Sequence, residues 1–203
     1  MLRSLCPETV ALTSGGHVRL MDFDLARVIG AARTFTMCGT VEYVAPEVLS
    51  GRGYGRGVDW WALGVLFFEL LTGTTPFKAD NTVQTYRRIA TGRYSFPRTI
   101  GSGDAQLINQ LLRTTESRRL GVRGGESSLK RHVFYEGIDW TAVERERLVP
   151  PQQPFVSMKG GVTVNYDCFP EENEFSEPLF DANFDDRERF KEFDILMRRG
   201  VFA

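Results

Sequence analysis

Residues 58–72 read VDWWALGVLFFELLT and decide the fold. This stretch is apolar on nearly every face, and Gly73 and Pro76 follow it as helix stop signals. It therefore predicts a buried helix at the core of a domain. Outward from it, the apolar periodicity predicts four further helices over residues 80–91, 105–113, 127–132 and 140–147. The fold class expected from this pattern is mainly α.

The segment before the buried helix predicts a short β element and a long loop. A turn signal at residues 14–16 (SGG) precedes residues 17–21 (HVRLM), whose alternation favours a short strand. Residues 30–57 are irregular apart from an expected helical turn over residues 46–49, where Pro46 suits a first helical position. Ordered loops of this length are usually functional, so we expect this one to carry part of a site.

Charge divides the 203 residues into two parts. Residues 1–135 carry 17 basic and 11 acidic side chains, whereas residues 136–203 carry 8 and 15. Five of the nine prolines lie beyond Val149, and residues 171–188 hold eight acidic residues and one arginine. Such a tail cannot build its own core, so we expect it not to be ordered along its full length, with a helix over 185–198 as the alternative.

Composition also argues against several classes of protein. A net charge of −1 without a basic run argues against nucleic-acid binding. The longest charge-free apolar run, residues 60–68, is far below the roughly 18 residues that suggest a membrane span. The three cysteines are an odd number without metal spacing, and Pro7 and Glu8 interrupt any signal-peptide core. We therefore expect a cytoplasmic, reduced protein without a nucleic-acid or membrane partner.

Several short motifs occur in a specific order around the buried helix. They are the sequences DFD at 22–24, APE at 45–47 and DWWALG at 59–64, followed by Arg119. In this order they resemble a serine/threonine protein kinase from the catalytic loop onward. Residues 34–47 (TFTMCGTVEYVAPE) resemble the activation segment of the AGC group. Residues 132–140, 154–155 and 165–173 resemble the tail of cyclic-nucleotide-dependent kinases, with the cGMP-dependent branch as the closer likeness.

This resemblance implies the architecture of a kinase C-terminal lobe. Residues 1–135 would form the partial kinase domain, with a short β element at its N-terminus, and residues 136–203 would form an extended acidic AGC tail. Because the sequence begins inside the catalytic loop, we expect the N-terminal lobe to be missing. The family uses ATP and Mg²⁺, and that missing lobe puts their binding by this chain in question.

The catalytic loop departs from the family pattern. Where the family reads RDLKPEN, residues 3–9 read RSLCPET. The resemblance then implies that Ser4 replaces the catalytic base, that Cys6 replaces the lysine facing the transferred phosphoryl group, and that Thr9 replaces the amide that holds Mg²⁺. Thr9 could still offer one oxygen, and Asp22 matches the Mg²⁺-binding carboxylate. Asp24 stands where most kinases carry a positive-φ glycine, a conformation that Asp tolerates.

Other family roles carry over residue by residue. The resemblance implies that Thr36 is the activation-loop phosphosite and that Arg3 and Arg27 clasp its phosphate. It implies that Glu8 and Glu69 bind a basic substrate side chain and that Met37, Val41 and Val44 form an apolar pocket. The Glu47–Arg119 ion pair and Asp59 have structural roles in this resemblance. Thr36 can equally be an ordinary loop threonine, and the groove residues ordinary surface residues.

Three functions stay open at this point. The first is a pseudokinase or partial kinase without catalytic activity that binds a protein or basic peptide through its activation-segment face. The second is a fragment, through a truncated gene prediction or otherwise, of an active ATP-dependent kinase that phosphorylates Ser/Thr near basic residues. The third is a non-functional remnant. A partner protein that carries a small lobe is also compatible with the resemblance.

Overall fold

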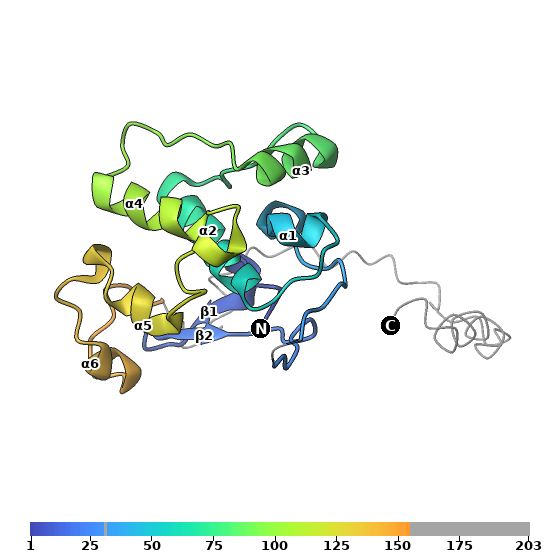
Figure 1. Cartoon of the computed structure of the whole chain (residues 1–203). Helices are drawn as coiled ribbons and strands as arrows, with labels where there is room; N and C mark the ends of the chain where they lie inside the picture. Colours follow the sequence, from blue (N-terminus) through green and yellow to red (C-terminus); the bar gives the residue numbers. More distant parts are fainter. Residues whose placement is uncertain (31, 155–203) are drawn as a thin grey trace, which may run out of the picture. The chain divides into compact units, whose positions relative to one another are not determined.

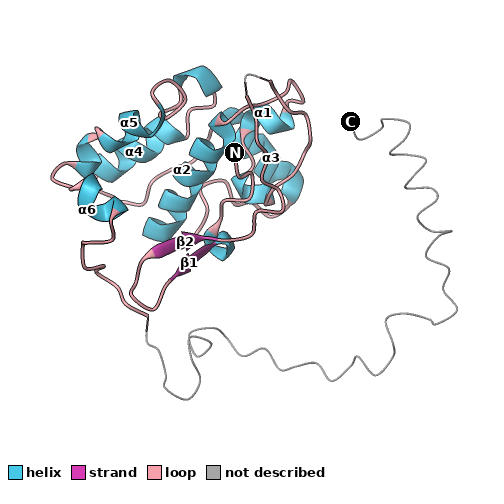
Figure 2. Ribbon diagram, turned by 90° about the horizontal axis from the view of Figure 1, so that it is seen from below, coloured by secondary structure: helices cyan, strands magenta, loops and turns pink. Residues whose placement is uncertain are grey.

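The computed structural model describes residues 1–30 and 32–154, and these residues are mainly helical (Figures 1 and 2). The fold class predicted from the sequence is confirmed. The strands and α-helices are β1 (Val10–Leu12), β2 (Val18–Leu20), α1 (Pro46–Leu49), α2 (Gly57–Thr72), α3 (Thr82–Thr91), α4 (Ser102–Leu111), α5 (Gly125–Lys130) and α6 (Trp140–Glu144). Four 3₁₀ turns join them: η1 (Pro7–Thr9), η2 (Val41–Tyr43), η3 (Glu116–Arg118) and η4 (Val133–Tyr135).

Helix α2 forms the core, as its uniformly apolar sequence predicts. Its Trp61 and Val65 are fully buried, and the Trp61 ring stacks on Phe77 with 5.3 Å between ring centroids. Helix α4 lies along α2 and buries Leu111 against it (Figure 1). The helices approach closely because α2 carries Gly64, where a Cβ atom would lie 2.8 Å from the Leu111 Cβ. These contacts leave little room for a larger residue at position 64.

The ends of α2 and α3 follow their sequence signals. Gly73 ends α2 in the left-handed region, with φ of 77°, where glycine carries no Cβ penalty. The Asn81 side chain caps α3 by accepting a hydrogen bond from the Gln84 backbone N–H at 2.9 Å. Gly92 then ends α3 with φ of 64°. Helix α4 begins at Ser102, three residues before the first residue that its apolar stripe predicts.

Strands β1 and β2 form an antiparallel hairpin at the N-terminal end of the fold (Figure 2). The sequence predicts β2 but not β1, because a three-residue strand carries almost no periodicity. The register pairs Val10 with Leu20 and Leu12 with Val18, so all four side chains share one face of the hairpin. Leu12, Val18 and Leu20 are exposed on that face.

Residues 136–154 belong to the same compact unit as the preceding lobe. Trp140 packs on Tyr135 with 5.2 Å between ring centroids, and its indole N–H donates to the Lys130 carbonyl at 3.3 Å. The expectations for an incompletely ordered tail and for a helix over residues 185–198 lie outside the described residues. Within residues 1–30 and 32–154, no helix has the length and apolar character to cross a membrane.

Candidate functional site

The backbone of the candidate catalytic loop is held by Asp59. This carboxylate lies in the first turn of α2 and accepts hydrogen bonds from the Leu2 backbone N–H at 2.8 Å and from the Arg3 backbone N–H at 2.9 Å. Arg3 needs this support because its φ of 69° is unusual for a residue with a side chain. The structure thus places Asp59 where the family resemblance puts an anchor.

Thr9 closes the catalytic loop from inside. Its hydroxyl accepts a hydrogen bond from the Cys6 backbone N–H at 3.1 Å and lies 3.2 Å from the Ser4 carbonyl and 3.0 Å from the Cys6 carbonyl. The residue is only 6% exposed. Because the hydroxyl is turned into the loop, it is not free to bind Mg²⁺. The sequence alone allows Thr9 to offer one oxygen to this ion.

Ser4 and Asp22 are brought together by a single hydrogen bond. The Ser4 hydroxyl donates to the backbone carbonyl of Asp22 at 3.2 Å. Asp22 has φ of 55°, and its carboxylate accepts a long 3.4 Å hydrogen bond from the Asp24 N–H. The positive φ expected at Asp24 therefore lies at Asp22 instead, and Asp24 lies inside the turn that follows, which the Ala26 N–H closes on the Phe23 carbonyl at 2.8 Å.

Cys6 brings no positive charge to the site. Burial, followed by a hydrogen bond to Glu8, raises the pKa of its thiol, so the side chain is neutral at physiological pH. The same hydrogen bond lowers the pKa of the exposed Glu8 carboxyl. A neutral thiol thus occupies the position where the family carries an ammonium group, and an ionised carboxylate lies beside it.

The activation segment is fixed at its base by pairing between Thr34 and Tyr54. Their backbones exchange two hydrogen bonds, of 3.0 and 2.9 Å, and the Arg27 guanidinium donates to the Thr34 hydroxyl at 2.9 Å. The Tyr54 hydroxyl donates to the Thr36 carbonyl and lies 3.4 Å from the Arg3 guanidinium. Both predicted clasp residues therefore lie around this segment, while the Thr36 side chain is exposed.

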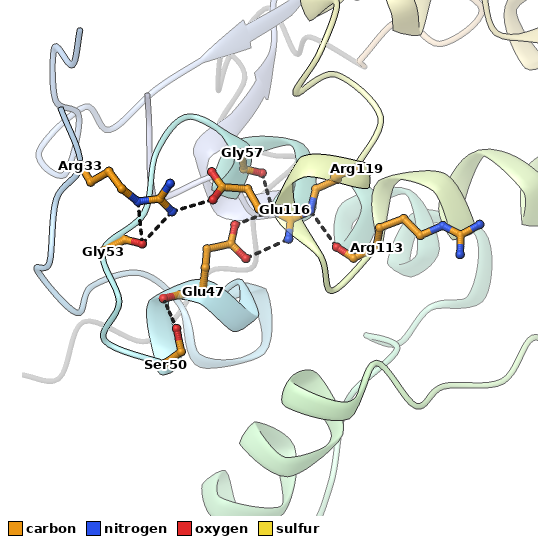
Figure 3. A network of polar contacts seen from close by, with 8 residues as sticks. All are labelled: Arg33, Glu47, Ser50, Gly53, Gly57, Arg113, Glu116 and Arg119. Atoms are coloured by element: carbon orange, nitrogen blue, oxygen red, sulfur yellow. Dashed lines mark hydrogen bonds and ion pairs between the residues drawn. The ribbon is translucent and has the colours of Figure 1, made fainter. Parts of the chain in front are cut away.

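The expected ion pair between Glu47 and Arg119 is present and buried (Figure 3). Two parallel hydrogen bonds of 2.6 and 2.8 Å join the guanidinium to the carboxylate. Arg119 also donates to the Gly57 carbonyl at 2.8 Å and to the Arg113 carbonyl at 3.1 Å, and it lies over the Trp61 ring at 5.1 Å. Its side chain is 0% exposed. The pair ties the end of the activation segment to α2.

The two predicted acidic residues of the substrate groove lie near Tyr43. The Tyr43 hydroxyl donates a short hydrogen bond to the Glu69 carboxylate. Burial, then Glu69, and to a smaller extent Glu8 raise the pKa of Tyr43 well above its usual value. Glu69 thus contacts Tyr43 directly, whereas Glu8 acts on this phenol only through its charge.

The predicted apolar pocket is only partly assembled. Val44 is buried and lines a cavity of about 20 Å³, which is enough for one water molecule. Val41 is half-buried and does not line that cavity, while Met37 is 59% exposed. The three side chains thus do not form one enclosed pocket in this structure.

Sequence reasoning missed two residues that organise the site. Tyr43 supports Glu69, and Tyr54 supports both Arg3 and the segment that carries Thr36. The available signal for Tyr54 was an aromatic residue between two glycines in an irregular loop. Tyr43 carried no signal of its own, because a buried phenol and a core aromatic residue look alike in a sequence.

Comparisons with known proteins agree with this geometry. Residues 1–134 match the family described as protein kinase domain. The cAMP-dependent protein kinase catalytic subunit PRKX of Mus musculus is 40% identical over 192 residues, which are 94% of this chain and 53% of the relative. Its Homo sapiens counterpart is 42% identical over 170 residues, covering 83% of this chain and 47% of the relative.

A relative from the cGMP-dependent branch is equally similar. The cGMP-dependent protein kinase, isozyme 1, of Drosophila melanogaster is 44% identical over 153 residues, which are 73% of this chain and 20% of the relative. The comparisons thus support the AGC type without separating its cAMP- and cGMP-dependent branches. The chain spans about half the length of the two PRKX relatives it matches.

The buried ion pair predicts a large effect of Arg119→Ala on stability. This change leaves the Glu47 carboxylate buried without its partner, which typically costs 3–5 kcal/mol, that is about 4 kcal/mol of unfolding free energy. Arg19→Ala is the matched control, since it removes an exposed ion pair with Glu146 worth about 1 kcal/mol or less. Urea unfolding of both variants measures the difference, and equal midpoints would contradict the structural role of Arg119.

The inward-facing Thr9 hydroxyl predicts an effect on the catalytic loop. Thr9→Val keeps the shape but leaves the Cys6 N–H without its acceptor, and we expect a loss of about 1–3 kcal/mol. Thr9→Ser keeps the hydroxyl and should lose markedly less. Urea midpoints and hydrogen exchange at Cys6 check this expectation. Equal stability of the valine variant and the unchanged chain would mean that the hydroxyl does not close the loop.

Proposed function

The chain belongs to the protein kinase family and is of the AGC type, and on this premise we propose that it acts by binding protein segments without transferring phosphate. The proposed binding surface is the activation-segment face, where the family resemblance assigns Glu8 and Glu69 to a basic substrate side chain. The ligand class is a peptide with basic side chains. The chain would then be a pseudokinase in the sense of retaining the fold without the chemistry.

The hydrogen bond from Ser4 to the Asp22 carbonyl carries this proposal. Kinase chemistry requires a group that accepts the proton of the substrate hydroxyl, and the family uses a carboxylate for it. The Ser4 proton is committed to a carbonyl, and a serine hydroxyl is far too weak a base near neutral pH. No other carboxylate occupies this position in the loop.

The remaining loop residues do not fit an ATP–Mg²⁺ site of the kinase type. Such a site needs the carboxylate after the strand together with the loop asparagine, and a lysine that stabilises the phosphoryl group. Here Asp22 is exposed, but Thr9 is turned inward and Cys6 is a buried neutral thiol. The loop therefore lacks the catalytic base and also stabilises the charge of a transferred phosphoryl group less well.

Binding, in contrast, needs only the groups that the structure retains. The Asp59 anchor and the Glu47–Arg119 pair hold the face in shape, and Tyr43 orients the Glu69 carboxylate. An arginine or lysine of a partner would meet two carboxylates there. Attraction of this kind between partly exposed charges weakens with salt, which gives the proposal a clear signature.

An active kinase with this chain as one part is the second candidate. The intact scaffold favours it, because Asp59 holds the candidate catalytic loop and the Glu47–Arg119 pair holds the end of the activation segment here, in the structural roles that the family resemblance implies. A longer transcript that encodes a glycine-rich phosphate loop before Met1 would support this candidate. The cytoplasmic location inferred from the cysteines remains a prediction under both candidates.

The proposal predicts peptide binding without phosphate transfer. We expect a fluorescent peptide with two arginines and one serine to bind the chain, and Glu69→Gln to weaken the binding at least about fivefold through loss of one charge contact. Glu136→Gln, an exposed carboxylate on η4's C-terminal side, is the matched control and should leave affinity unchanged. Fluorescence polarisation at two salt concentrations measures this.

The proposed absence of phosphate transfer is tested by incubating the chain with radiolabelled ATP, Mg²⁺ and the same peptide. We expect no incorporation of phosphate. Incorporation that disappears in Asp22→Ala would overturn the pseudokinase proposal and favour the active kinase. Binding that is unaffected by Glu69→Gln would instead remove the activation-segment face as the binding surface.

Phosphorylation of Thr36 is predicted to raise the melting temperature. A phosphate adds a charge of about −1.5 to −2 and can accept charge-assisted hydrogen bonds from the guanidiniums of Arg3 and Arg27. Because we propose that the chain does not phosphorylate itself, a separate kinase must modify it. Thermal melts in low salt compare the two forms, with Arg27→Ala as the control that should abolish most of the gain. Equal melting temperatures would argue against a clasp.

A further inference from the structure

A groove lined by basic side chains lies at the C-terminal end of α2. It has an open volume of about 750 Å³ and lies between the end of α2, the loop after it, α3 and the segment after α3. The charged side chains that line it are all basic: Lys78, Arg88 and Arg93. From residue 78 to residue 98 the sequence holds five basic residues and one acidic residue.

These three cations have no carboxylate partner among the described residues. The ion pairs of residues 1–30 and 32–154 involve other basic side chains. Arg88 donates to the Lys78 carbonyl, which fixes one side chain across the groove without neutralising it. The nearby Glu42 carboxylate accepts the hydroxyl of Thr75, a lining residue, but does not line the groove itself. The groove therefore keeps an uncompensated positive charge.

The aromatic side chains that line the groove, called its floor below, are packed on one another. Phe68, Tyr94 and Phe96 line it and pack on one another with ring centroids 5.4–5.9 Å apart. The Tyr94 hydroxyl donates to the Asn109 side chain at 2.8 Å, and burial raises the pKa of Tyr94 to about 12, so the phenol stays neutral. Apolar surface between cations suits a ligand that has both anionic and apolar groups.

We propose that this groove binds an acidic peptide segment of a partner protein, with Asp or Glu side chains paired to Lys78, Arg88 and Arg93 and one apolar side chain on the aromatic floor. A peptide suits the site because the three cations come from the loop after α2, from α3 and from the segment after α3, and aromatic side chains line the groove with them. The hydroxyls of Thr74 and Ser95, which also line the groove, can form hydrogen bonds with the peptide backbone. This proposal does not depend on whether the chain transfers phosphate.

The test uses the full chain and a fluorescein-labelled peptide with six Asp or Glu residues around a central Phe. Polarisation in low salt should show saturable binding that weakens as salt rises. The double variant Lys78→Glu with Arg93→Glu should weaken binding at least about tenfold, because two contacts become repulsive. Both side chains are exposed, so the fold should tolerate the change, and circular dichroism checks it.

A matched control separates the groove from general positive charge. Arg87 and Arg98 belong to the same basic stretch but do not line the groove. Arg87→Glu with Arg98→Glu changes the net charge equally and should alter affinity less than about twofold, since long-range attraction is screened by salt. Equal losses in the two double variants would overturn the proposal.

Two further probes test the ligand class. Replacing the central Phe of the peptide by Ala should weaken binding if the aromatic floor is used, and no change would remove the floor from the proposal. ATP, inorganic phosphate and an oligodeoxynucleotide of equal charge serve as competitors. Each competitor is added at the concentration at which unlabelled peptide displaces half of the labelled probe. Displacement of the probe by any of the three would overturn the assignment to an acidic peptide.

Discussion

One buried guanidinium organises the described part of the chain. Arg119 satisfies the Glu47 carboxylate, the Gly57 and Arg113 carbonyls and the face of Trp61 at the same time. A buried charge is tolerable only when its partners are complete, so α1, α2 and the segment after α4 are fixed relative to one another. The fixed start of α2 then presents Asp59 to the catalytic loop. The geometry of the candidate catalytic loop thus depends on α2, whose Asp59 lies 56 residues after Arg3 in the sequence.

Polar side chains of the candidate catalytic loop bond internally, whereas charged side chains of the surface are exposed. Inside the loop, the groups of Ser4 and Thr9 bond to backbone atoms of the site itself, and Cys6 is buried. On the surface, Glu8, Lys78 and Arg93 are exposed, and Glu69 is half-buried against Tyr43. Acidic Glu69 near the end of α2 and the basic lining of the groove thus carry opposite charges. Fields of opposite sign on adjacent surfaces orient a charged partner before it makes contact.

The sequence predicted the elements whose signals are local. Helix α2 followed from its continuous apolar stretch, and the ends of α2 and α3 from Gly73 and Gly92. Strand β1 was not predictable, since three residues carry no period and only pairing with β2 defines it. The ion pair of Glu47 and Arg119 was available only through family resemblance, because 72 residues separate them. Side-chain direction was the main failure: the inward turn of the Thr9 hydroxyl and the exposure of Met37 depend on packing that no local pattern encodes.

The hydrogen bond between Ser4 and the Asp22 carbonyl has a consequence for how this loop can change over generations. An ionised aspartate at position 4 could not make this hydrogen bond, because a carboxylate only accepts and the Asp22 carbonyl only accepts as well. Restoring the family residue at that single position would therefore disturb the loop before it restored any chemistry. The Thr9 hydroxyl meanwhile bonds to the Cys6 backbone N–H and lies near the Ser4 backbone carbonyl, so it would keep the loop closed whichever side chain stands at position 4. The backbone of this loop is thus held independently of the side chain that decides its chemistry.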